Sequence, residues 1–175
     1  SKPYYFAKDW EIEESKCFVF HISDPSLFNK YSQFKLDNFI DEILIRLDFD
    51  ESEIAKLQKE KIHYFLFKDE NEIELLTGYK ACGLYFIPYD YIISTFNCHY
   101  HELVHLLINY KLKTINLYTL PLLQEGLAVA FGGRGGKEPN VILNMGLFLA
   151  QSNFVDYKTM LSKNDFYQFD PSMTY

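Results

Sequence analysis

Residues 99–110 (HYHELVHLLINY) place three histidines and a glutamate in an otherwise apolar segment. On a helical wheel His101, Glu102 and His105 share one quadrant, and aliphatic side chains fill most of the remaining arc. The helix would be buried around most of its circumference, so its polar quadrant must face a specific partner. The spacing is that of HExxH, in which two histidines one turn apart bind a zinc ion and the glutamate lies beside the metal.

A third ligand is needed, because catalytic zinc takes three protein ligands and keeps one position for water. Glu125 follows His105 by 20 residues, as the acidic residue of the apolar run PLLQEGLAVAF (121–131). Burial of Glu125 would carry the same desolvation cost as burial of Glu102, and one zinc ion would offset both. The remaining interpretation, an accidental motif in a metal-free helical core, leaves that cost unexplained.

These two segments resemble the gluzincins, the zinc metallopeptidases that include thermolysin-like and aminopeptidase-N-like enzymes. In that group a glutamate on a second helix follows HExxH, often within E-G-x-A, and this chain has HELVH (101–105) and EGLA (125–128). The resemblance covers residues 81–132. It implies that His101, His105 and Glu125 hold Zn²⁺ and that Glu102 is the general base in peptide-bond hydrolysis. The metzincin pattern HExxHxxGxxH does not fit, because Ile108 stands at its glycine.

At some positions this sequence differs from the patterns of the thermolysin-like and aminopeptidase-N-like enzymes. Val129 stands where thermolysin-like enzymes carry an aspartate that supports a zinc-binding histidine, so another group must provide that support. No GxMEN stretch precedes the metal helix, so aminopeptidase specificity is not expected. The sequence stops at Tyr175, from which we expect a domain truncated at its C-terminal end. Tyr175 is then either the oxyanion-stabilising donor or a terminal aromatic without a role.

The elements that must position these residues follow from the spacing of apolar side chains. Strands are predicted over 17–22 and 62–67, and helices over 36–47, 50–61, 72–77, 99–110, 121–131, 141–151 and 155–161. Residues 81–95 predict an edge strand or hairpin, because Pro88 interrupts them. The order predicts an α+β domain, and the resemblance implies a zincin-like one with a small, mostly antiparallel sheet. Its edge strand at 81–86 would pair with an extended peptide substrate.

Composition limits the other classes of function. At 175 residues the chain predicts a single domain, 1–175. Its net charge of −7 argues against a nucleic-acid partner. The longest apolar runs are shorter than the roughly 20 residues of a transmembrane helix. The chain begins SKPYYF without methionine, which suggests a trimmed or mature form and favours a secreted or periplasmic location. The three cysteines fit neither a disulfide framework nor a CxxC zinc cluster.

Several other residues look functional. GGRGGK (132–137) fails the phosphate-loop pattern and predicts a turn, from which Arg134 could touch a substrate. His21 and His63 are expected to be core or edge histidines. His99 points away from the zinc quadrant on the wheel. Two functions remain: a zinc-dependent peptidase, or an inactive binding or scaffold domain that keeps the zinc for stability.

Overall fold

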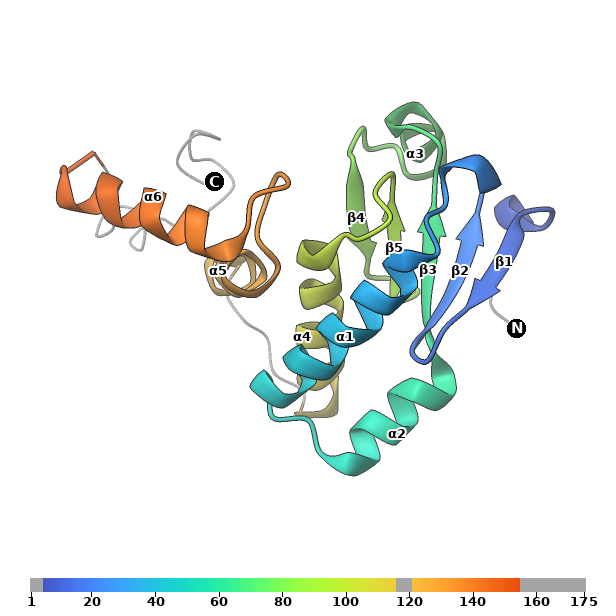
Figure 1. Ribbon diagram of the computed structural model, residues 1–175, viewed down its shortest axis with the longest axis horizontal. Coiled ribbons are helices and arrows are strands. Elements are labelled where there is room, and N and C mark those ends of the chain that lie inside the picture. Colours follow the sequence, from blue (N-terminus) through green and yellow to red (C-terminus); the bar gives the residue numbers. More distant parts are fainter. Residues whose placement is uncertain (1–4, 116–120, 155–175) are drawn as a thin grey trace.

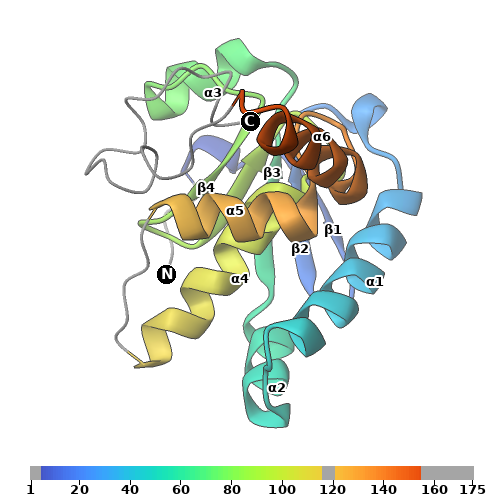
Figure 2. The ribbon, with the colours of Figure 1, turned by 90° about the vertical axis from the view of Figure 1, so that its left-hand side faces the viewer.

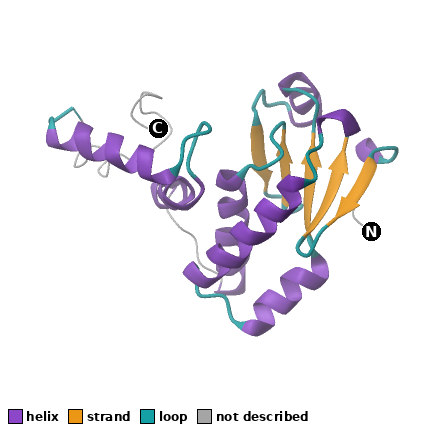
Figure 3. Cartoon of the chain, viewed as in Figure 1, coloured by secondary structure: helices purple, strands orange, loops and turns teal. Residues whose placement is uncertain are grey.

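The computed structural model describes residues 5–115 and 121–154, in which a five-stranded sheet is covered by helices (Figures 1 and 3). The strands are β1 (Glu11–Glu14), β2 (Phe18–Ile22), β3 (Ile62–Leu66), β4 (Gly83–Phe86) and β5 (Tyr91–Ser94). The helices are α1 (Tyr31–Arg46), α2 (Glu51–Glu60), α3 (Glu70–Thr77), α4 (Tyr100–Ile115), α5 (Pro121–Gly132) and α6 (Pro139–Gln151), with short 3₁₀ turns at Tyr5–Ala7 and Pro25–Leu27. The predicted α+β class is confirmed, and the helix predicted over 155–161 lies outside the described residues.

The sheet is mixed, with strand order β1-β2-β3-β5-β4. The β1–β2 and β4–β5 pairs are antiparallel, whereas β2–β3 and β3–β5 are parallel. The prediction of a mostly antiparallel sheet was therefore wrong. Parallel neighbours need long connections, and α1 and α2 provide one between β2 and β3. β4 lies at the edge of the sheet, as residues 81–86 predicted.

The main core lies between the sheet and helices α1, α2 and α4. The strands contribute Phe18, Phe20, Tyr64 and Ile92, and the helices contribute Leu36, Ile40, Leu57, Leu103 and Leu107. The opposite face of the sheet carries a second cluster, formed by Phe65, Phe67, Tyr91 and Ile73 of α3 with Trp10 packed against it. Because α4 packs directly on the sheet, its aliphatic arc is buried, while His101 and His105 lie on the side away from the sheet core.

Helix α5 lies across α4 on the side away from the sheet (Figure 2). Val104 and Ile108 of α4 pack against Ala128 of α5 in a small buried cluster. Helix α6 follows after a hairpin and has no buried residue among those described. This packing of α5 on α4 places the second predicted metal helix directly over the first.

None of the helices that the structure describes is long and apolar enough to cross a membrane.

His21 lies on β2, hydrogen-bonded to His63 on β3 over 2.9 Å, and burial lowers its pKa from 6.5 to about 4. At pH values between about 4 and 6.5, His21 binds a proton in the unfolded chain but not in the folded chain. We therefore expect the free energy of unfolding to fall as the pH drops from about 6.5 to about 4, and not to change through this group above 6.5. Denaturant titrations across this range measure the effect. A His21→Gln variant should show a smaller slope, and an unchanged slope would contradict the assignment to His21.

Candidate metal centre

His101 and His105 lie one turn apart on α4, and each is only 8% exposed. The neighbouring Leu103, Val104 and Leu107 are fully buried, which fixes the rotation of the helix about its axis. Both imidazoles consequently face α5. The polar quadrant predicted from the sequence is thus aimed at one neighbouring helix.

Glu125 of α5 meets both imidazoles. Its Oε2 is 3.4 Å from His101 Nε2 and its Oε1 is 3.5 Å from His105 Nε2, while the two Nε2 atoms are 3.2 Å apart. A tetrahedral metal ion with bonds of about 2.0–2.1 Å would hold its ligand atoms about 3.3 Å apart. The three side chains that the sequence singled out as ligands therefore form a buried group that could hold a metal ion.

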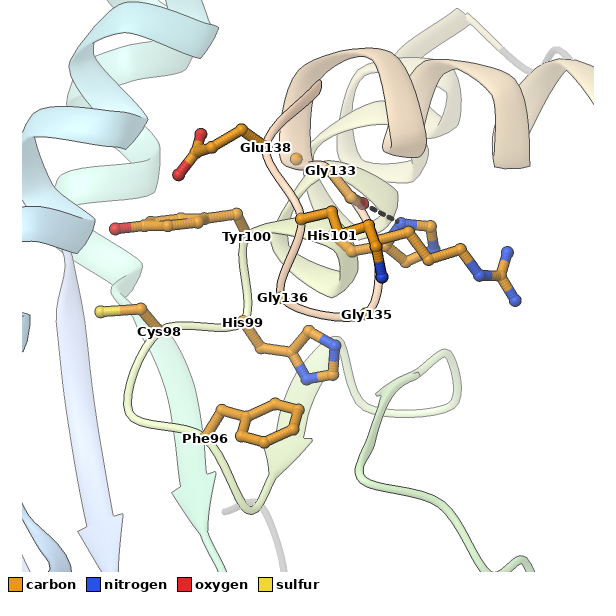
Figure 4. Close-up of a pocket in the computed structure, with 12 residues that line it drawn as sticks. Phe96, Cys98, His99, Tyr100, His101, Gly133, Gly135, Gly136 and Glu138 are labelled. Carbon is orange, nitrogen blue, oxygen red and sulfur yellow. Dashed lines mark hydrogen bonds between the residues drawn. The ribbon is translucent and has the colours of Figure 1, made fainter. Parts of the chain in front are cut away.

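The residues after α5 support His101. Its Nδ1 lies 3.0 Å from the carbonyl oxygen of Gly133, which can only accept, so Nδ1 carries the proton and Nε2 is left to bind a metal (Figure 4). Gly133 has φ of +71°, in the left-handed region that favours glycine, where the chain turns into a hairpin closed between Arg134 and Lys137. This carbonyl supplies the support that Val129 could not.

Arg134 of the same hairpin donates from Nη1 to Glu125 Oε2 over 3.2 Å. Burial raises the pKa of the Glu125 carboxyl, but the adjacent imidazoles of His101 and His105 outweigh that effect and hold the pKa well below its usual range. Glu125 is therefore ionised, as a metal ligand must be. Arg134 lies on the cleft wall, as the sequence suggested, and contacts a predicted ligand there.

Glu102 lies beside this group and is not part of it. Its Oε2 accepts a hydrogen bond of 2.8 Å from the backbone N–H of Tyr85 on β4, and its side chain is 16% exposed. Burial raises the pKa of Glu102, against the lowering effect of His101, His105 and the Tyr85 N–H. A carboxylate with a raised pKa, held at one oxygen and adjacent to the two histidines, is suited to accept and return a proton.

These groups open on a cleft of about 600 Å³. Its walls are formed by the start of β4, the segment that joins β5 to α4, the first turn of α4, the glycine hairpin and α6. The lining residues include Gly83, His99, Glu102, Arg134 and Met145. A neighbouring pocket of about 290 Å³ lies between the hairpin and residues 96–101 (Figure 4). His101 and Glu102 both line this cleft, so the group that could hold a metal borders, through His101, on a space that a substrate could enter.

His99 was not predicted to belong to the site. The helical wheel gave it an angle away from the zinc quadrant, but α4 begins at Tyr100 and His99 is the residue before its first turn. It therefore lies in the cleft, with Nε2 3.9 Å from Glu102 Oε1. Burial lowers its pKa from 6.5 to about 4, so it is neutral at pH 7. The only signal in the sequence was its position two residues before the motif.

The other residues singled out in the sequence are two strand histidines, three cysteines and Tyr175. His21 and His63 are strand histidines in contact with each other, which fits their predicted structural role. Cys17, Cys82 and Cys98 are free thiols; we expected small buried thiols, but only Cys17 is buried, whereas Cys98 is partly buried and Cys82 is exposed. Tyr175 lies outside the described residues, so the structure does not place it.

Gly132, the last residue of α5, permits the close approach of α5 to the start of α4. A Cβ atom there would lie 2.6 Å from the backbone nitrogen of His101, whereas a Cβ at Gly126 on the same helix would meet nothing within 4 Å. We expect Gly132→Ala to cost about 1–3 kcal/mol of unfolding free energy and to weaken metal binding. Gly126→Ala should be neutral or stabilise α5 by up to about 1 kcal/mol.

Urea unfolding and zinc titration of both glycine variants measure these effects. Equal behaviour of the two variants would show that the contact at Gly132 does not hold the helices in place.

No family model, curated protein or solved structure matches this chain. Membership of the gluzincins therefore stays a prediction that rests on the motifs and on the geometry of the site.

Proposed function

We propose that this chain is a zinc-dependent peptidase of the gluzincin type. The observation that carries the proposal is the group formed by His101, His105 and Glu125, whose donor atoms lie 3.2–3.5 Å apart and whose His101 lines a cleft together with Glu102. Two neutral imidazoles and one carboxylate are the donor set of catalytic zinc sites in metallopeptidases. A bound Zn²⁺ would supply a Lewis acid that polarises a peptide carbonyl and acidifies a water molecule.

Glu102 would carry the proton transfers. The Tyr85 N–H holds one carboxylate oxygen, and the other remains available to take a proton from the attacking water. The hydroxide adds to the carbonyl carbon, and Glu102 then passes the proton to the departing amine as the C–N bond breaks. One residue thus serves as base and then as acid, and no second titrating group is needed.

The edge strand offers a place for the substrate backbone. The Cys82 carbonyl accepts from Thr95 N–H on the β5 side, whereas the Tyr85 N–H points away from β5 to Glu102. In an antiparallel pair, every second residue points its backbone N–H and C=O away from the neighbouring strand. Gly83 is two residues before Tyr85, so its backbone groups also point away from β5. Gly83 lines the cleft. We infer that an extended peptide pairs with β4 at Gly83, beside Glu102.

Incubation of the zinc-loaded protein with a broad peptide library tests this proposal. We expect cleavage that a chelator abolishes and that added zinc restores. If the zinc-loaded protein cleaves no peptide while it retains zinc, the binding or scaffold function replaces the peptidase.

A further inference from the structure

His99 is held in a fixed place in the cleft. Gly83 of β4 lies directly against its ring, because a Cβ atom at Gly83 would come within 2.2 Å of His99 Nδ1. The ring of Phe96 meets the imidazole edge-on, with centroids 5.4 Å apart (Figure 4). The side chain remains 17% exposed, on the side of the cleft. Contacts with Gly83 and Phe96 therefore fix the imidazole of His99, and one side of the ring is open to the cleft.

The hydrogen bonds around Ser94 decide which ring nitrogen of His99 carries the proton. Ser94 Oγ accepts from Phe96 N–H over 2.9 Å, so its own proton can go to His99 Nδ1 at 2.9 Å, to the Cys82 carbonyl at 3.3 Å or to the neighbouring Tyr64 hydroxyl oxygen. That carbonyl already accepts two shorter bonds, from Thr95 N at 2.8 Å and Thr95 Oγ1 at 3.0 Å, which fill its two lone pairs. Of the two remaining acceptors, the imidazole nitrogen of His99 is a much stronger base than the phenol oxygen of Tyr64, so the serine proton goes to Nδ1 and Nε2 carries the N–H.

This N–H faces the free oxygen of Glu102. Oε2 of the carboxylate is already held by Tyr85 N–H, and Oε1 lies 3.9 Å from His99 Nε2. A shift of about 1 Å brings this pair to hydrogen-bond distance, and one water molecule can bridge it without a shift.

We propose that His99 is a positioning residue for Glu102, whose Nε2–H holds the oxygen that exchanges protons with water and substrate. This role rests on the proposed peptidase function of the same site. The contact itself, between His99 and Glu102, can be tested without turnover.

Nuclear magnetic resonance of the imidazole ¹⁵N nuclei in the full zinc-loaded chain reads the tautomer directly. We expect the Nε2–H form for His99, and a shift of that N–H resonance in Glu102→Ala, in which the acceptor is removed. A Ser94→Ala variant should lose the single tautomer. The Nδ1–H form in the wild-type chain would overturn the proposal, whatever the activity.

Two variants of similar size separate positioning from packing. The amide nitrogen of glutamine reaches the place of Nε2, whereas that of asparagine reaches only the place of Nδ1. We expect His99→Asn to lower kcat about 10- to 100-fold, the effect of losing a hydrogen bond to a charged group, with KM and zinc content unchanged. His99→Gln should restore most of that loss.

Equal kcat values in the two variants, or a loss confined to KM, would overturn the positioning role. If the wild-type chain shows the Nε2–H contact with Glu102 but cleaves no peptide, the peptidase function fails and the contact stands. The two failures are therefore distinguishable.

Discussion

Glu102→Gln is expected to keep its zinc and to lose about 10²- to 10⁴-fold in turnover, the usual contribution of a general base. The amide has the shape of the carboxylate, and its oxygen can still accept the 2.8 Å bond from Tyr85 N–H. It cannot take a proton from water. The variant should therefore fold, bind metal with wild-type stoichiometry and bind peptide, while hydrolysis fails.

Steady-state kinetics on a cleaved peptide, with zinc content measured on the same sample, checks this expectation. Glu42→Gln is the matched control, because Glu42 lies on α1 in an exposed pair with Arg46 and should behave as wild type. Full turnover by Glu102→Gln would remove Glu102 from the chemistry. Loss of zinc in this variant would instead make Glu102 a ligand.

Replacement of the predicted zinc ligand His105 by alanine should strongly reduce both zinc binding and hydrolysis. Without the His105 imidazole the group keeps only His101 and Glu125, too few for a catalytic zinc site. We expect His105→Ala to weaken zinc binding by more than the ~10- to 100-fold typical of an outer-shell partner, and to abolish hydrolysis at limiting zinc. Because zinc binds only the folded chain, the wild-type melting temperature should rise with added zinc and that of the variant should not.

Thermal unfolding with and without a chelator measures this difference. His63→Ala is the control, because it removes a histidine on β3 away from the metal-binding group. A control variant that also loses its response to zinc would indicate a general effect on folding. Zinc-dependent stabilisation of His105→Ala equal to wild type would place the metal elsewhere.

The centre of the site could be predicted from the sequence because burial leaves few choices. Leucine, valine and isoleucine around HELVH require a helix buried on most sides, and the three polar residues can then share only one face. Glu125 was predicted for a similar reason, since an acid in an apolar helix needs a partner. The structure confirms that His101, His105 and Glu125 come together.

Two other features of the site could not be predicted from the sequence. The support of His101 comes from the carbonyl of Gly133, and every residue has a carbonyl. His99 was assigned from a wheel that extended one residue too far, because helix ends are set by capping contacts rather than by the period of apolar residues. Both features depend on where the chain turns.

The sheet was predicted less well than the helices. β1 was missed because its sequence EIEE is dominated by glutamates and lies exposed at the edge of the sheet. The two parallel pairings were missed because pairing direction depends on how the connecting helices return the chain, which no strand sequence encodes. The edge position of β4 was predictable from Pro88, which cannot join a central ladder.

X-ray diffraction from crystals of the zinc-loaded protein, recorded on both sides of the zinc absorption edge, tests the central claim most directly. The account predicts one anomalous peak per chain, within bonding distance of His101 Nε2, His105 Nε2 and a Glu125 carboxylate oxygen. A peak at other residues, or no zinc in protein prepared with zinc in excess, would contradict it.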